Sequence, residues 1–69
     1  MAKLVKRSFT LAGHRTSVAL EPEFWQALAA IAAARRGTMA ALVAEVDAAR
    51  GADRPLASAL RIFALTRPR

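Results

Sequence analysis

The sequence contains no cysteine, a single histidine and only five acidic residues among its 69. Without cysteine there is neither a disulfide framework nor a thiolate metal site. Around the single histidine, His14, one chain cannot build a metal site of the usual ligand composition. None of the five carboxylates has an obvious nucleophile or base as its partner. The composition therefore gives no support to a metal, a cofactor or catalytic residues, and no enzyme is expected.

Long hydrophobic runs are also missing. No segment reaches the roughly 18 uninterrupted apolar residues that a membrane-spanning helix needs. The first seven residues, MAKLVKR, are too short and too charged to hold the apolar region of a signal peptide. A cytoplasmic protein with no membrane partner is expected.

Basic and apolar residues dominate what is present. Eleven Lys and Arg residues give a net charge of +6, which favours binding to a polyanion such as nucleic acid. The apolar share is 55%, more than a lone chain of this length would easily hide. We therefore expect a homodimer whose interface covers the surplus. The alternative is an alanine-rich helical monomer with a slightly apolar surface.

The segment 15–20 has the alternation of a strand with one buried face. Val18 and Leu20 share one parity, and the other parity carries Arg15, Ser17 and Ala19. Pro22 then closes the strand and opens a helix, where its missing N–H costs nothing. A lone short strand has no partner for its edge within its own chain, so we expect a second copy to pair with it antiparallel. Such a two-stranded ribbon fits the major groove of DNA.

The rest of the chain is expected to be one domain, residues 8–69, behind a basic flexible arm, residues 1–7. The segment 8–11 also alternates and could form a further short strand. Helical spacing predicts helices over about 22–35, 39–49 and 55–66. Gly37 can take the left-handed geometry that ends the first helix, and Thr38 can cap the second.

Strand, helix, glycine-containing break and Thr-capped helix is an order that resembles the ribbon-helix-helix repressors, the superfamily of the Arc and methionine repressors. The stretches KRS (6–8), AGHRTSV (12–18) and LEPEFW (20–25) look like a bacterial subfamily of short ribbon-helix-helix domain proteins. LVAEVDAARG (42–51) and SALRIF (58–63) extend the match. The resemblance implies a mostly α fold with one short N-terminal strand, an intertwined homodimer with a two-stranded antiparallel intersubunit ribbon, and an extra C-terminal helix. It further implies sequence-specific binding of double-stranded DNA, most simply by a transcriptional repressor.

Two positions depart from the pattern of that family. Arg36 stands where glycine is usual, so the break between the first two helices is expected to be tight or strained. Ala19 stands on the outward side of the ribbon, where a polar residue is common, although its methyl group can still contact a thymine methyl.

The candidate sites follow from the strand parity and the resemblance. The expected base-contacting residues are Arg15, Ser17 and Ala19; the alternative is the wet face of an ordinary amphipathic strand. Thr38, together with the free N–H groups of Met39 and Ala40, is expected to form an anion site at a helix start. The other candidate phosphate contacts are Lys3, Lys6 and Arg7, which could instead be merely solvated, and Arg36, which could reach the flanking DNA backbone. The expected dimer core is Val18, Leu20, Phe24, Trp25, Leu28, Ile31, Leu42, Val43 and Val46.

Two other functions compete with the repressor. In an antitoxin, a toxin or other protein would bind the C-terminal helix, ordered only in the complex, although only residues 67–69 follow that helix. A protein-only adaptor would use the same fold to dimerise without an operator.

Overall fold

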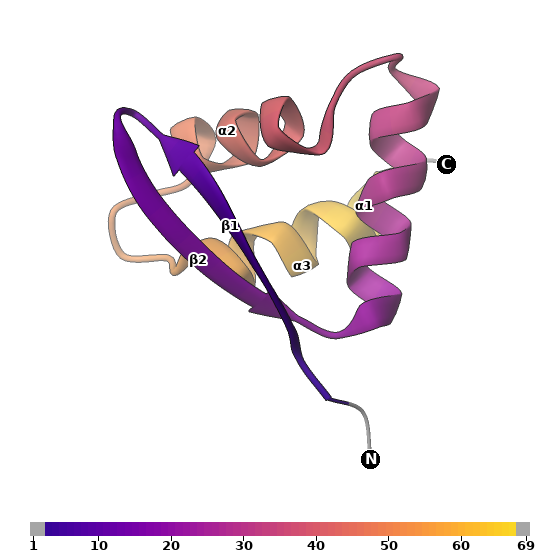
Figure 1. Cartoon of the computed structure of the whole chain (residues 1–69), viewed down its shortest axis with the longest axis horizontal. Coiled ribbons are helices and arrows are strands. Elements are labelled where there is room, and N and C mark those ends of the chain that lie inside the picture. Colours follow the sequence, from indigo (N-terminus) through magenta and orange to yellow (C-terminus); the bar gives the residue numbers. More distant parts are fainter. Residues whose placement is uncertain (1–2, 68–69) are drawn as a thin grey trace.

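The computed structural model describes residues 3–67, and residues 1–2 and 68–69, at the ends of the predicted arm and domain, lie outside that range. In chain order the elements are β1 (Val5–Leu11), β2 (His14–Leu20), α1 (Pro22–Ala34), α2 (Met39–Ala49) and α3 (Leu56–Thr66) (Figure 1). A two-stranded antiparallel sheet thus precedes three helices, an order consistent with a ribbon-helix-helix fold, although one chain supplies two strands and not the one short strand expected. The helix bounds differ from the predicted ranges by one residue at most.

The two strands form a hairpin within one chain, with Val5 opposite Leu20 and Leu11 opposite His14. Ala12 and Gly13 connect them with φ of 52° and 82°, and two positive φ values are what a type I′ turn needs. The expectation that the strand over 15–20 has no partner in its own chain is therefore wrong. Residues 5–7, expected in a flexible arm, belong to β1. The basic character of this segment concealed its strand, and Ala-Gly is a weaker turn signal than Asn-Gly.

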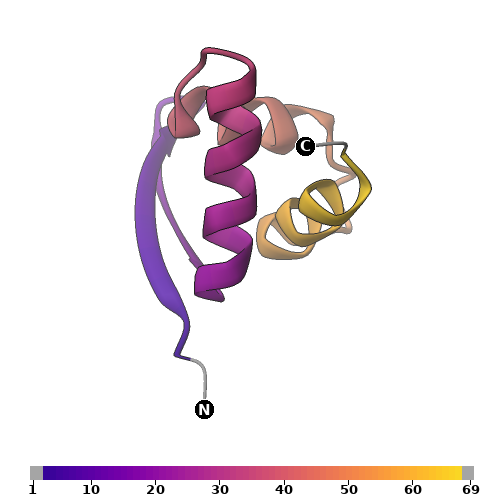
Figure 2. The ribbon, with the colours of Figure 1, turned by 90° about the vertical axis from the view of Figure 1, so that its right-hand side faces the viewer.

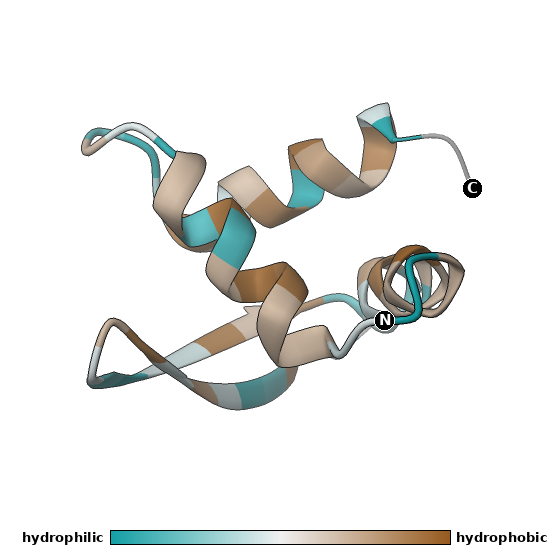
Figure 3. Cartoon of the chain, turned by 90° about the horizontal axis from the view of Figure 1, so that it is seen from above, coloured by the Kyte–Doolittle hydropathy of each residue, from teal (hydrophilic) through white to brown (hydrophobic). Residues whose placement is uncertain are grey.

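The hairpin forms one layer, and the helices lie behind it. In Figure 2 the hairpin lies at the left edge, α1 runs through the middle and α3 lies on the right. Hydropathy changes along both strands (Figure 3), because alternate residues face the helices. Leu11, Val18 and Leu20 are buried on that inner face, and Phe9 is half-buried beside them.

The core takes a fully buried side chain from each of four elements: Leu20 of β2, Leu28 of α1, Val43 of α2 and Leu60 of α3. The third helix is therefore part of the core. Of the nine residues expected in the dimer core, eight are buried within one chain, and only Phe24 stays partly exposed. One chain thus covers them without a second copy.

The break between α1 and α2 is closed by backbone hydrogen bonds. The N–H of Gly37 donates to the carbonyl of Ala32 at 2.9 Å, and the N–H of Arg36 donates to that of Ala33 at 3.0 Å. These two bonds define a Schellman motif, whose left-handed position is usually glycine. Here Arg36 takes it, with φ of 56°, so the assignment of that geometry to Gly37 is wrong. The strain expected at this break lies at Arg36 itself.

No single helix among residues 3–67 has both the length and the apolar character to cross a membrane. Taken together, α1 and α2 have the length and composition of a membrane-spanning segment, but the two helices are bent by 102° at the break between them.

Candidate nucleic-acid interface

The outer face of the hairpin presents six side chains in three cross-strand pairs. We call this set the ribbon face: Lys6 opposite Ala19, Ser8 opposite Ser17, and Thr10 opposite Arg15. All are exposed except Ala19, which is half-buried. The two serine hydroxyl oxygens lie 3.0 Å apart across the strands. The face therefore combines two cations, three hydroxyls and one methyl group, and it contains no carboxylate.

This composition suits the floor and walls of the DNA major groove, which admits a two-stranded ribbon. The guanidinium of Arg15 has no hydrogen-bond or ion-pair partner among residues 3–67, so its donors are available for guanine O6 and N7. Serine and threonine hydroxyls can donate to or accept from several base edges. The small side chains between the two cations allow close approach of the ribbon.

All three residues predicted to contact bases, Arg15, Ser17 and Ala19, lie on this face. Reasoning from the sequence missed Ser8 and Thr10, which share it. The sequence did contain a signal for this strand, because polar and apolar residues alternate over 8–11 in the same way as over 15–20. Extending that alternation back to residue 5 would have paired the two strands.

The three cations assigned to the arm are divided by the structure. Lys6 lies on the ribbon face, and Lys3 is exposed just before β1. Arg7 has the opposite parity, and its guanidinium carbon lies 5.2 Å from the centre of the Trp25 ring. A cation–π contact at that distance ties Arg7 to the helix layer. Within β1, Arg7 therefore lies on the opposite face of the hairpin from Lys6.

The start of α2 lies beside the hairpin in Figure 2. Thr38 caps this helix, since its Oγ1 accepts the N–H of Ala41 at 3.0 Å. The N–H groups of Met39 and Ala40 remain among the free donors of the first turn. Arg36, exposed in the preceding break, adds a cation nearby. A helix start with free N–H groups and a neighbouring cation can bind a phosphate group.

The ion pairs among residues 3–67 lie outside the ribbon face. Arg35 pairs with Glu45 at 2.8 Å, Arg50 with Asp47 at 2.9 Å, and Arg61 with Glu21 at 2.9 Å. The hydrogen bond from Arg61, helped by the backbone N–H of Glu21, lowers the pKa of the Glu21 carboxyl. Since three of the five carboxylates are paired elsewhere, they leave the positive charge of the ribbon face uncompensated.

Comparison with known families identifies the architecture independently of this geometry. A model of the ribbon-helix-helix domain matches residues 4–67. No curated protein and no solved structure matches the chain. Domains of this family generally form dimers and bind DNA, and they are typically not enzymes. The match therefore supports a DNA-binding or regulatory role in general. With its paired strands, its Thr-capped second helix and a match over nearly its whole length, the chain belongs to the ribbon-helix-helix domain family.

Proposed function

We propose that this chain is a cytoplasmic, homodimeric transcriptional repressor that binds double-stranded DNA in a sequence-specific way. The observation that carries the proposal is the ribbon face, where small and hydroxyl side chains separate two unpaired cations. No other surface among residues 3–67 combines a two-stranded ribbon with this chemistry.

Within this proposal, base reading and backbone binding fall to different residues. Arg15 and Ser17 contact base edges, Ala19 contacts a thymine methyl, and Ser8 and Thr10 add hydroxyls from β1. Lys3, Lys6 and Arg36 contact phosphates, together with the start of α2 at Thr38 and Met39. Arg7 is not included, because its guanidinium packs against Trp25.

Homodimerisation in this proposal uses surface that one chain leaves uncovered. Each strand of the hairpin has one free edge, and an unpaired edge is a template for another strand. Between α1 and α3 a hollow is lined by Phe24, Ala27, Ala30 and Leu65, and Leu65 is 74% exposed. Two hairpins brought together across a two-fold axis would read two half-sites.

A gel-shift titration of the purified chain tests the proposal, using DNA from its own promoter region and random DNA of equal length. If a dimer neutralises about six to ten phosphates, affinity should fall roughly a thousandfold or more between 50 and 200 mM salt. Promoter DNA should bind more tightly than random DNA at each salt concentration. A flat salt response with no preference would reject DNA binding and favour the protein-only adaptor.

The antitoxin alternative gains nothing from the position of α3. Its apolar side, including Leu60 and Phe63, is buried against the rest of the chain. The antitoxin alternative needs a helix that is disordered in the free protein and folds on binding the toxin, and a helix that is already part of the core does not fit that role.

A further inference from the structure

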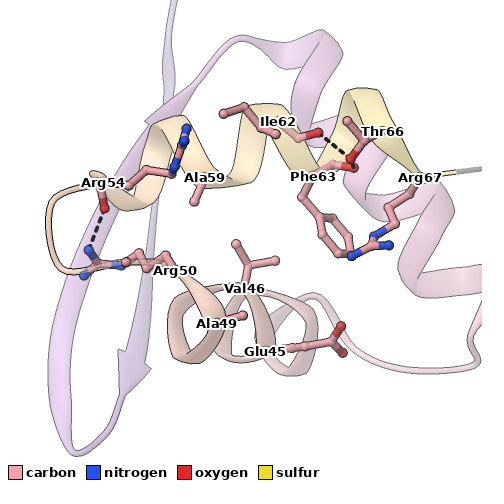
Figure 4. A pocket seen from close by; sticks show the side chains of 11 residues that line it. Glu45, Val46, Ala49, Arg50, Arg54, Ala59, Ile62, Phe63, Thr66 and Arg67 are labelled. Atoms are coloured by element: carbon pink, nitrogen blue, oxygen red, sulfur yellow. Dashed lines mark hydrogen bonds between the residues drawn. The ribbon is translucent and has the colours of Figure 1, made fainter.

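A groove between α2 and α3 lies away from the ribbon face. In Figure 4 these two helices flank it, and the hairpin lies behind them. Its volume is about 280 Å³. When the ribbon face is on DNA, this α2–α3 groove faces away from the bound duplex.

Arginine side chains stand at both ends of the α2–α3 groove. Arg50 and Arg54 lie at one end and Arg67 at the other (Figure 4). Arg50 is already engaged, by Asp47 and by the carbonyl of Arg54 at 2.7 Å. The guanidinium groups of Arg54 and Arg67, both exposed, form no ion pair with any residue among 3–67.

The middle of the groove is apolar. Val46 and Ala59 are buried beneath it, and Ile62 remains 43% exposed at its edge. The ring of Phe63 is buried, with the Arg67 guanidinium carbon 4.6 Å from its centre. One carboxylate, Glu45, also lines the groove, but Arg35 neutralises it at 2.8 Å. The apolar side chain that remains exposed between the two unpaired cations is therefore Ile62, which lies at the edge of a buried apolar floor.

The charges decide which occupant fits. A second copy carries a net charge of +6, and three of its five carboxylates are held by its own arginines. It therefore offers little negative charge to Arg54 and Arg67. Duplex DNA has the right sign, but a phosphate backbone has no apolar group for the floor beside Ile62. Both features are met by a protein segment with one or two apolar side chains flanked by carboxylates.

We propose that the α2–α3 groove is a docking site for a short acidic, partly apolar segment of another protein. Carboxylates on the two sides of the segment pair with Arg54 and Arg67, while its apolar side chains cover Ile62 and the floor between. This inference goes beyond DNA binding and does not depend on it, because no residue of the ribbon face takes part. In a DNA-bound protein the site would remain open to a partner.

Fluorescence anisotropy with a labelled Asp-Glu-Leu-Phe-Asp-Glu peptide tests this site on the full chain. The double variant Arg54→Glu, Arg67→Glu should bind the peptide about tenfold or more weakly, the loss expected for two exposed ion pairs. The matched control is Lys3→Glu, Lys6→Glu, which changes net charge equally but at the hairpin, and it should bind the peptide like the unaltered chain. Replacing Leu and Phe of the peptide by Ser should also weaken binding. Circular dichroism verifies that each variant is folded.

Amide chemical shifts locate the bound peptide. Changes at Val46, Ala59 and Ile62 are expected, with none on the ribbon face. Equal weakening by both double variants would overturn the proposal in favour of general charge attraction, and so would the absence of binding. If inorganic phosphate alone produced the same chemical-shift changes, the groove would be a site for a small anion, and the proposed peptide docking site would be rejected. The gel-shift with promoter DNA tests DNA binding, and the anisotropy titration tests peptide docking. The two measurements are independent, so failure of one proposal can be distinguished from failure of the other.

Discussion

At the scale of single residues, Arg36 is held in an unfavourable conformation at a position that could serve DNA. Left-handed backbone costs an L-residue roughly 1–2 kcal/mol, because Cβ crowds the following carbonyl. The cost is offset here by the two hydrogen bonds that end α1. The side chain retained at this position is a cation beside the start of α2.

Arg36→Gly should therefore stabilise the fold and weaken DNA binding at once. We expect a gain of about 0.5–1 kcal/mol in the free energy of unfolding, since glycine relieves the strain but adds entropy to the unfolded chain. Affinity for promoter and random DNA should fall by similar factors, because a phosphate contact carries no sequence information. Urea denaturation and gel-shift titration measure the two effects. Unchanged affinity would remove Arg36 from the phosphate-contacting set.

Arg15→Ala should affect promoter and random DNA unequally, because the guanidinium of Arg15 belongs to the ribbon face, where it can contact base edges. Arg15→Ala should weaken the free energy of binding to promoter DNA by about 1–3 kcal/mol per lost base contact. The difference in affinity between promoter and random DNA should therefore become smaller. Arg54→Ala, which removes the same charge on the opposite side of the molecule, is the matched control and should preserve this difference. Competition gel-shifts with both DNAs measure it. If Arg15→Ala leaves discrimination intact, base reading must lie in other residues.

At the scale of elements, an ion pair links the start of α1 to α3. The carboxylate of Glu21 accepts a hydrogen bond from Arg61 Nε at 2.9 Å across 40 positions of sequence. The guanidinium of Arg61 also lies 5.8 Å from the Phe24 ring centre. The first turn of α1 is thus tied to the third helix by a contact that depends on the charge of Glu21.

This contact makes part of the stability depend on pH. The pKa of the Glu21 carboxyl is lowered in the folded chain, mainly by the hydrogen bond from Arg61. As the pH falls, this carboxyl is therefore protonated in the unfolded chain at a higher pH than in the folded chain. Its contribution is fully present above the unfolded pKa, about 4.3 for glutamate, and is lost as pH falls through the lower folded value. Glu21→Gln should therefore be destabilising near neutral pH, and the difference should shrink on acidification. Urea denaturation at several pH values measures this, with Glu23→Gln as control; a difference independent of pH would contradict it.

The three helices and the strand β2 were predictable from local sequence, whereas the strand partner of β2 was not. Pro22 and Thr38 mark helix starts, and the helical spacing of apolar residues continues to Phe63, so all three helices follow from short-range patterns. The partner of β2 depends on a turn at Ala12 and Gly13, where alanine adopts a conformation rare for it. The place of Arg7 against Trp25 depends on tertiary packing, which parity shows only once β1 is recognised. The α2–α3 groove joins residues from two helices and had no signal in the sequence.

At the scale of the whole molecule, one chain closes its own core. The radius of gyration is 11.4 Å, close to the roughly 11 Å expected for a folded chain of this length. The hairpin covers one side of the helices, and α3 covers another. In the proposed dimer, the second copy would add surface for DNA binding and need not be a condition of folding.

Such a small core should be sensitive to its largest side chain. Trp25 is 3% exposed, and Trp25→Ala should cost about 3–5 kcal/mol, comparable with the entire stability of a domain this size. We expect the variant to be largely unfolded at room temperature by circular dichroism. Trp25→Phe keeps an aromatic ring and should remain folded, with a smaller loss from the missing N–H. A Trp25→Ala chain as stable as the unaltered one would show that this ring is not central to the core.

The same side chain gives the molecule an optical signal of its own. Trp25 is the only tryptophan, its indole N–H donates to the carbonyl of Val5 at 2.8 Å, and its ring lies 6.0 Å from that of Phe9. With Arg7 also on the ring, residues of β1 provide all three contacts. Detachment of β1 would thus change the indole emission even while the helices stayed intact. Since the indole lies on the inner side of the hairpin, an emission change on adding DNA would report movement of that strand and not stacking on a base.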